Sequence, residues 1–143
     1  MGMLTDFILA EPSDATAICR SWPQRDKWPC LRMTWLDNSM LAALALAWND
    51  ESLAEKLESG APVAAKTTNE GPWVFCLPDD FRDRLAALTP EQAPAVAQAW
   101  AQQEAPQSGG WAADNLEPIL DNLREFAQRA VREGKSILLW VCL

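Results

Sequence analysis

Histidine and tyrosine are both missing from this chain of 143 residues. The lack of imidazole excludes hydrolase arrangements that need a histidine base, and it excludes imidazole-ligated metal sites. The lack of tyrosine excludes phenolic acid–base chemistry. Four cysteines, at positions 19, 30, 76 and 142, form no Cys-x-x-Cys pair, and their spacing disfavours a four-cysteine zinc site. The sequence therefore favours a non-enzymatic protein and predicts no cofactor and no metal.

Positive charge is also scarce, because 12 lysines and arginines face 20 aspartates and glutamates, for a net charge of −8. Such a surface repels phosphate backbones, so we expect no nucleic-acid partner and consider a basic protein the better match. The run Ser108-Gly109-Gly110 lacks the remaining residues of a phosphate-binding loop.

Long apolar runs are missing as well. The longest, Ile137 to Leu143, is far too short to cross a bilayer. The first six residues show neither the basic nor the apolar region of a signal peptide, and without export the cysteines stay reduced by default. We therefore expect a cytoplasmic protein with no membrane partner, and the sequence leaves its oligomeric state open.

The hydrophobic pattern predicts one α+β domain over residues 1–143, with a small mixed or antiparallel sheet of three to five strands and about five helices. Strands are expected at 4–10, 63–68, 73–77 and 136–143. The last should be central, because its apolar run has no polar alternation. The middle two should form a hairpin in which Gly71 supplies the backbone freedom of the turn.

Helix boundaries carry clear signals. A short helix is expected around 13–20, Asp37 and Asp50 should cap two more, and Asp79 should start another. Thr89-Pro90-Glu91-Gln92 matches a capping box and predicts a helix that ends before Pro106. Residues 107–110 should form a loop, and a strongly amphipathic helix over 115–133 should end at Gly134. Residues 20–36 are expected to be irregular.

Both ends of the chain resemble a known group. The opening Met1-Gly2-Met3 with the strand Leu4–Ala10, and the closing helix–glycine–strand over Leu123–Leu143, resemble the YfbM-like small bacterial proteins of unknown function. The resemblance implies a small bacterial cytoplasmic α+β protein and carries no activity, cofactor or site residue.

The segment Arg20–Leu36 is the most informative part of the sequence. Its four basic residues and one acid give a local charge of +3, whereas the other 8 bases and 19 acids give −11. Tryptophan and arginine dominate binding hot spots, so the segment is a candidate partner surface. A flap over the core is the interpretation that we favour, a partner surface is the next, and a small-ligand pocket is the last. The candidate binding residues are Trp22, Arg25, Lys27, Trp28, Arg32 and Trp35.

Two further candidates lie outside that segment. Trp111 follows two glycines, where a loop could place its ring over a pocket, although packing is the simpler interpretation. Asp79, Asp80 and Asp83 cluster in one helical turn, where carboxylates could bind a cation or divide acid and base roles. The simpler interpretation makes Asp79 a helix cap and the acids favourable partners of the helix dipole. Trp48, Trp73, Trp100 and Trp140 are expected in the core.

Two functional hypotheses follow from these features. The first is a non-enzymatic interaction protein of immunity or regulatory type that meets a basic partner. The second is a small-molecule-binding protein or enzyme with a pocket lined by tryptophan and carboxylate. They differ in whether the tryptophans lie on the surface or converge with Asp79, Asp80 or Asp83 on a cavity.

Overall fold

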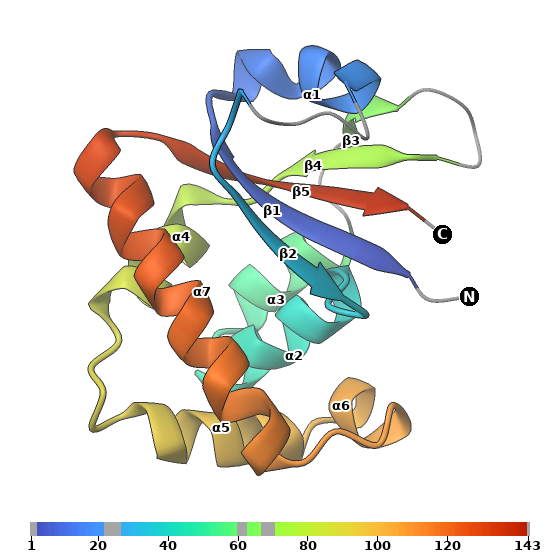
Figure 1. Ribbon diagram of the computed structural model, residues 1–143. Helices are drawn as coiled ribbons and strands as arrows, with labels where there is room; N and C mark the ends of the chain where they lie inside the picture. The colour runs from blue at the N-terminus through green and yellow to red at the C-terminus, as the bar shows by residue number, and fades with distance from the viewer. Residues whose placement is uncertain (1–2, 22–26, 60–62, 67–70, 143) are drawn as a thin grey trace.

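A five-stranded antiparallel sheet in the order β2-β1-β5-β4-β3 forms the centre of the computed structural model, which describes residues 3–21, 27–59, 63–66 and 71–142 (Figure 1). Neighbouring strands are antiparallel throughout. The strands are β1 (Leu4–Ala10), β2 (Cys30–Thr34), β3 (Val63–Lys66), β4 (Trp73–Cys76) and β5 (Ser136–Cys142). The predicted α+β single-domain fold class is confirmed.

Helices cover both faces of this sheet unequally (Figure 1). A short 3-10 helix (Pro12–Asp14) and α1 (Ala15–Ser21) lie on one face. The remaining helices lie on the other side of the sheet, with α5 and α6 packed on α2 rather than on the strands: α2 (Asn38–Ala47), α3 (Glu51–Glu58), α4 (Asp79–Ala87), α5 (Ala93–Ala101), α6 (Glu104–Ser108) and α7 (Ala113–Glu133). Among the described residues, no helix is long and apolar enough to span a membrane.

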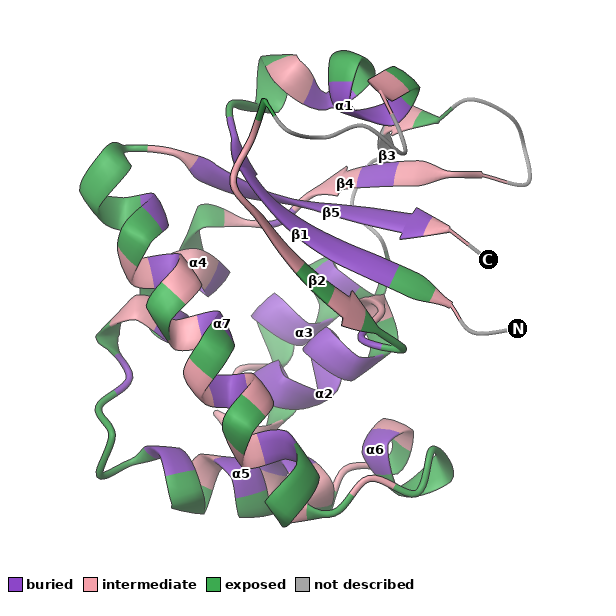
Figure 2. Ribbon diagram, viewed as in Figure 1, coloured by how far each residue is buried: buried purple, intermediate pink, exposed green. Residues whose placement is uncertain are grey.

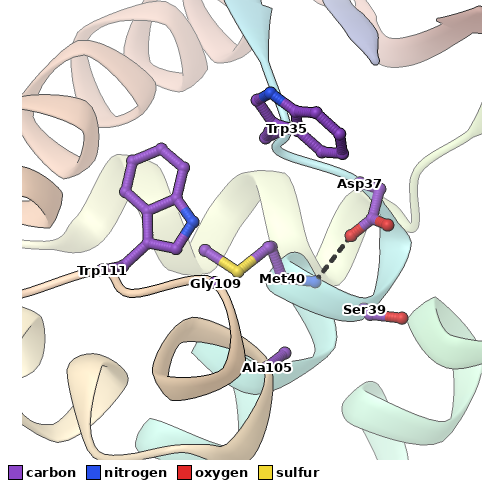
Figure 3. A pocket seen from close by; sticks show the side chains of 7 residues that line it. All are labelled: Trp35, Asp37, Ser39, Met40, Ala105, Gly109 and Trp111. Atoms are coloured by element: carbon purple, nitrogen blue, oxygen red, sulfur yellow. Dashed lines mark hydrogen bonds between the residues drawn. The ribbon is translucent and has the colours of Figure 1, made fainter. Parts of the chain in front are cut away.

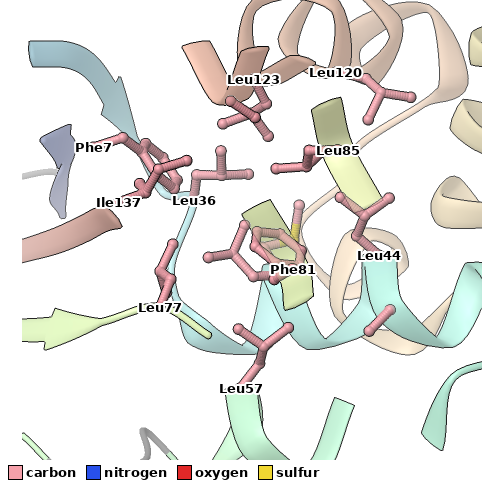
Figure 4. Close-up of a cluster of buried hydrophobic side chains, with 14 of the residues drawn as sticks. Phe7, Leu36, Leu44, Leu57, Leu77, Phe81, Leu85, Leu120, Leu123 and Ile137 are labelled. Carbon is pink, nitrogen blue, oxygen red and sulfur yellow. The ribbon is translucent and has the colours of Figure 1, made fainter. Parts of the chain in front are cut away.

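The two central strands are buried along almost their whole length (Figure 2). Side chains alternate between the faces of a strand, so one sheet can serve two cores. Phe7 and Ile137 point into the larger core, where they meet leucines and Phe81 from the helices (Figure 4). Ile8 and Trp140 point into the smaller core beneath α1. The prediction of a central last strand is confirmed.

The predicted caps of α2 and α3 are confirmed. Asp37 accepts a hydrogen bond from the Met40 amide, and Asp50 accepts one from the Leu53 amide, each at 3.1 Å. Gly134 ends α7 in a left-handed conformation (φ 66°), as predicted. Helix α7 begins at Ala113, slightly earlier than predicted, and so contains Pro118.

The capping box before α5 is also formed. The Thr89 amide donates to the Gln92 side chain at 3.1 Å, and the Gln92 amide donates to the Thr89 hydroxyl at 3.3 Å. The regular helix starts only at Ala93, after a turn. Pro94 follows at the second helical position, where an amide hydrogen would have no helical partner.

Two local predictions were wrong. Residues 20–36 are not all irregular, because 30–34 form the edge strand β2, where exposed Arg32 alternates with Leu31 and Met33 packed on the larger core. Residues 107–110 are not all loop, because α6 continues to Ser108. Pro106 is tolerated there because the first amides of any helix lack helical acceptors.

Strands β3 and β4 pair antiparallel, as the hairpin prediction requires, although positions 67–70 lie outside the described residues. Gly71 has φ 93°, and a β-carbon on it would stand 2.7 Å from carbon atoms of the Trp73 ring. Both observations explain why glycine is required at this position.

Candidate functional site

The structure separates Trp28 and Trp35, the two tryptophans of the segment 20–36 that it describes. Trp22 lies outside the described residues. Trp28 is half-buried and packs against the smaller core on the α1 side of the sheet. Trp35 is 51% exposed and lies on the α2 side. The two described indoles therefore belong to different surfaces and do not form one patch.

Of the basic candidates in the same segment, the structure describes Lys27 and Arg32. Arg25 lies outside the described residues. Lys27 is exposed in the turn before β2, and Arg32 is exposed on β2 itself. Neither lines the groove described below, so Trp35 is the one described residue of this segment that reaches that site.

The carboxylates of α4 are held by neighbouring groups. Asp79 accepts a hydrogen bond from the Ser136 hydroxyl at 3.0 Å, and Arg82 contacts Asp83 at 2.9 Å. Asp80 lies 3.8 Å from the Lys56 ammonium. The cap position of α4 is Pro78, so the interpretation of Asp79 as the cap was wrong. None of the three acids lines the groove described below.

The four remaining predicted core tryptophans divide into two pairs. Trp100 and Trp140 are fully buried, as predicted. Trp48 and Trp73 are half-buried and pack against the edge of the larger core. Within the described part of the chain, no three cysteine or acidic side chains are grouped in a way that could hold a metal ion.

Trp35 and Trp111 meet at a hollow of about 440 Å³ (Figure 3). Its walls come from the β2–α2 connection, the first turn of α2, the first turn of α6 and the α6–α7 loop. In Figure 3 the two rings stand on different sides of the hollow, with the Met40 thioether between them. The described lining residues are Trp35, Asp37, Ser39, Met40, Ala105, Gly109 and Trp111.

The position of Trp35 depends on an unusual backbone conformation. Its φ of 61° is left-handed, a conformation rarely adopted by a bulky residue. Its amide donates to the Met3 carbonyl at 3.0 Å, and the next amide, of Leu36, donates to the buried Thr5 hydroxyl at 3.2 Å. Leu36 is thereby buried in the core, while Trp35 stays at the surface beside the hollow.

The position of Trp111 depends on the glycine two residues before it. A β-carbon on Gly109 would stand 2.8 Å from Cδ1 and 2.9 Å from Nε1 of the Trp111 ring, so the indole lies directly against this glycine. The Trp111 amide also donates to the Pro106 carbonyl at 2.9 Å, which ties the loop back to α6. The possibility that a loop places Trp111 at a pocket therefore agrees with the structure.

A second hollow, of about 450 Å³, adjoins the first because both are lined by Ser39 and Ala105. It extends between α2 and α6 toward Leu46, which is 41% exposed. The Ser39 hydroxyl donates to Glu58 at 3.4 Å across one wall. Its described lining residues are Ser39, Ala43, Leu46, Glu58, Gln103, Glu104, Ala105 and Ser108.

We call these two hollows together the groove. Three acids, Asp37, Glu58 and Glu104, line it, whereas none of the described lining residues is lysine or arginine. One end is aromatic, and the other combines Leu46 with two glutamates. An acidic, partly apolar channel of this kind suits a ligand that carries positive charge.

Most of the groove was missed at the sequence level. Asp37 was identified only as a helix cap. Glu58 and Glu104 were assigned no role from the sequence. The available signals were the closeness of Trp35 to Asp37 in the sequence and the two glycines before Trp111.

Comparison with protein-family models, curated proteins and solved structures finds no match for this chain. The resemblance of the chain ends to YfbM-like proteins thus stays a prediction. The groove is therefore the feature on which a functional proposal rests.

Proposed function

We propose that this protein is a non-enzymatic interaction module, of regulatory or immunity type, that binds a basic segment of a partner protein along the groove. The observation that carries this proposal is the groove lining, where two indoles and three acids occur without a described basic residue. Indoles supply large rigid contact areas, and the carboxylates select for positive charge. The net charge of −8 also attracts a basic partner from a distance.

The proposal can be tested with a short fluorescent peptide of alternating arginine and serine, titrated with the protein while anisotropy is measured. A matched peptide of glutamate and serine is the charge control. We expect binding of the basic peptide only, with an affinity that falls as salt rises. Replacing the two glutamates of the groove, as Glu58→Gln with Glu104→Gln, should weaken binding roughly tenfold because two facing charges are lost.

A polycation also binds loosely to any acidic protein, so a matched variant is needed. Glu91 and Glu125 are exposed glutamates that do not line the groove. The variant with Glu91→Gln and Glu125→Gln has the same net charge as the groove variant and should bind almost like the wild type. An equal loss in both variants, or no binding by the wild type, would contradict the proposal.

Binding of a small molecule is the second candidate, and the size of the tryptophan-lined hollow favours it. About 440 Å³ falls within the usual range of ligand pockets. A small ligand held between the indoles would need Trp35 and Trp111 but not Glu58 or Glu104. If a ligand binds the variant with Glu58→Gln and Glu104→Gln as tightly as it binds the wild type, this second function is favoured.

A further inference from the structure

The chain contains two short sequences of the form Trp-x-Asp, and both precede a helix. Trp35-Leu36-Asp37 leads into α2, and Trp48-Asn49-Asp50 leads into α3. In both, one oxygen of the aspartate caps the helix by accepting an amide hydrogen bond at 3.1 Å. The two sites thus offer the same pair of groups, an indole and a capping carboxylate.

At the second of these sites a guanidinium group joins the indole and the carboxylate. The Arg84 guanidinium carbon, from α4, lies 5.2 Å from the centre of the Trp48 ring. Its Nη1 lies 3.4 Å from the Asp50 oxygen that does not cap, and its Nη2 donates to the Trp48 carbonyl at 3.2 Å. This protein therefore already builds one arginine site from a Trp-x-Asp sequence.

At the first site the same groups face the groove. Asp37 caps with Oδ1, and its other oxygen takes part in no hydrogen bond or ion pair among the described residues. Trp35 is half-exposed, and Trp111 adds a second ring. The backbones differ, because the left-handed residue is Trp35 itself at the first site and Asn49 at the second. The two sites therefore share an indole and a capping carboxylate but not a backbone conformation.

We infer that the aromatic end of the groove binds an arginine side chain of the partner, with its guanidinium between Trp35 and Trp111 and paired with Asp37. This inference rests on the proposed function and names the residue that the groove recognises. A planar guanidinium stacks on indole and pairs with a carboxylate at the same time, whereas a lysine ammonium is a point charge with stronger hydration. Arginine should therefore be preferred to lysine.

The dipole of α2 opposes a cation at its N-terminus, but the charge of Asp37 at the same end offsets it. The full negative charge of this carboxylate outweighs the partial positive charge of the helix. The second site shows the same balance, since Arg84 contacts Asp50 at the N-terminus of α3. Beyond the indoles, Glu58 and Glu104 are placed to meet basic residues that flank the arginine.

The test uses three peptides that are identical except at one central position, which is arginine, lysine or citrulline, with flanking lysines in all three. Citrulline keeps the planar shape of arginine but carries no charge. Isothermal titration with the wild type should show the arginine peptide binding roughly tenfold more tightly than the lysine peptide, and citrulline should bind weakest. Equal affinity for arginine and lysine would overturn the inference.

Variants then locate the preference within the groove. Asp37→Asn keeps an oxygen for the helix cap but removes the charge, and Trp35→Asn removes one ring. Each should abolish the preference for arginine while leaving the weaker binding through Glu58 and Glu104. The variant with Glu58→Gln and Glu104→Gln should weaken all three peptides and keep the preference.

These outcomes separate the two proposals. A preference for arginine that survives both Asp37→Asn and Trp35→Asn would overturn this inference and leave the interaction function standing. Failure of every peptide to bind the wild type would contradict the proposed function itself.

Discussion

The indole of Trp100 donates a hydrogen bond to the main-chain carbonyl of Met40, with 2.9 Å between Nε1 and the oxygen. Trp100 belongs to α5 and is fully buried, whereas Met40 lies in the first turn of α2 and lines the groove. This bond therefore fixes the turn that carries Asp37, Ser39 and Met40 against the helical core. The shape of the groove depends on a contact that is itself inaccessible to a ligand.

Replacing this tryptophan as Trp100→Phe should lower the free energy of unfolding by about 2–4 kcal/mol, because it removes a buried hydrogen bond and leaves a cavity. Urea unfolding followed by circular dichroism measures the loss. A change below about 1 kcal/mol would mean that neighbouring side chains refill the site, contrary to the close packing around Trp100.

Gly109→Ala should displace the Trp111 ring. The new β-carbon would lie 2.8 Å from the ring, and the backbone of Gly109 (φ −87°) is otherwise compatible with alanine. We expect altered near-ultraviolet circular dichroism of the tryptophans and weaker peptide binding. An unchanged spectrum together with unchanged binding would contradict the close contact between Gly109 and Trp111.

Gly110→Ala is the matched control for that substitution. Gly110 has φ 74°, but a β-carbon on it would meet no atom within 4 Å. Its replacement should lower stability by about 1 kcal/mol through backbone strain alone. The tryptophan spectrum and peptide affinity should stay close to those of the wild type.

Substitutions at Asp37 should separate its capping role from its charge. Asp37→Ala removes the acceptor for the Met40 amide and should cost about 1 kcal/mol of stability. Asp37→Asn keeps an acceptor, and no described base pairs with this carboxylate, so stability should change by less than about 0.5 kcal/mol. Thermal unfolding of both variants tests this, and a large loss in Asp37→Asn would show that the charge is structural.

Local signals in the sequence explain why much of the fold could be predicted. The caps at Asp37 and Asp50 and the stop at Gly134 act within a few residues, so their chemistry is visible without a structure. The closing strand was equally clear, because a run of large apolar residues can be buried only at the centre of a sheet.

The groove could not be predicted in the same way. It joins Trp35 and Asp37 to Glu104 and Trp111, which lie about 70 residues further along the chain, and only the packing of α5 and α6 brings them together. The left-handed backbone of Trp35 is also invisible in sequence, because propensity argues against it. The high density of tryptophan and arginine in residues 20–36 suggested one patch, whereas the structure places Trp28 on the α1 side of the sheet and Trp35 on the α2 side.

Cys76 should react slowly with alkylating reagents near neutral pH. Burial of this thiol, and secondarily the charge of Asp79, raise its pKa above the ordinary cysteine value. The thiolate is the reactive form, so the rate of iodoacetamide labelling should rise only at a pH above that expected for an exposed thiol. Asp79→Asn should move the profile modestly toward lower pH. Mass spectrometry of the peptide containing Cys76 measures the profile.

The raised pKa of Cys76 also determines how its contribution to stability depends on pH. Because the folded state holds the Cys76 proton more tightly than the unfolded chain, its contribution to stability is present below the unfolded pKa. That contribution is lost as the pH rises through the folded pKa. If the labelling rate of Cys76 rises at the same pH as that of an unfolded cysteine peptide, or at a lower pH, the raised pKa of Cys76 is contradicted.

Trp35→Asn should separate stability from binding most sharply. A left-handed conformation costs a bulky residue about 1–3 kcal/mol, whereas asparagine adopts it readily. Trp35 is also 51% exposed, so its removal forfeits only about half of the area that a buried indole would contribute, which the relief of backbone strain offsets. We expect the variant to be as stable as the wild type or more stable by about 1 kcal/mol in urea unfolding, while its affinity for the arginine peptide falls. The backbone conformation of Trp35 costs free energy. The indole at the groove therefore serves a purpose other than stability. A marked loss of stability in Trp35→Asn would show instead that the ring is part of the core.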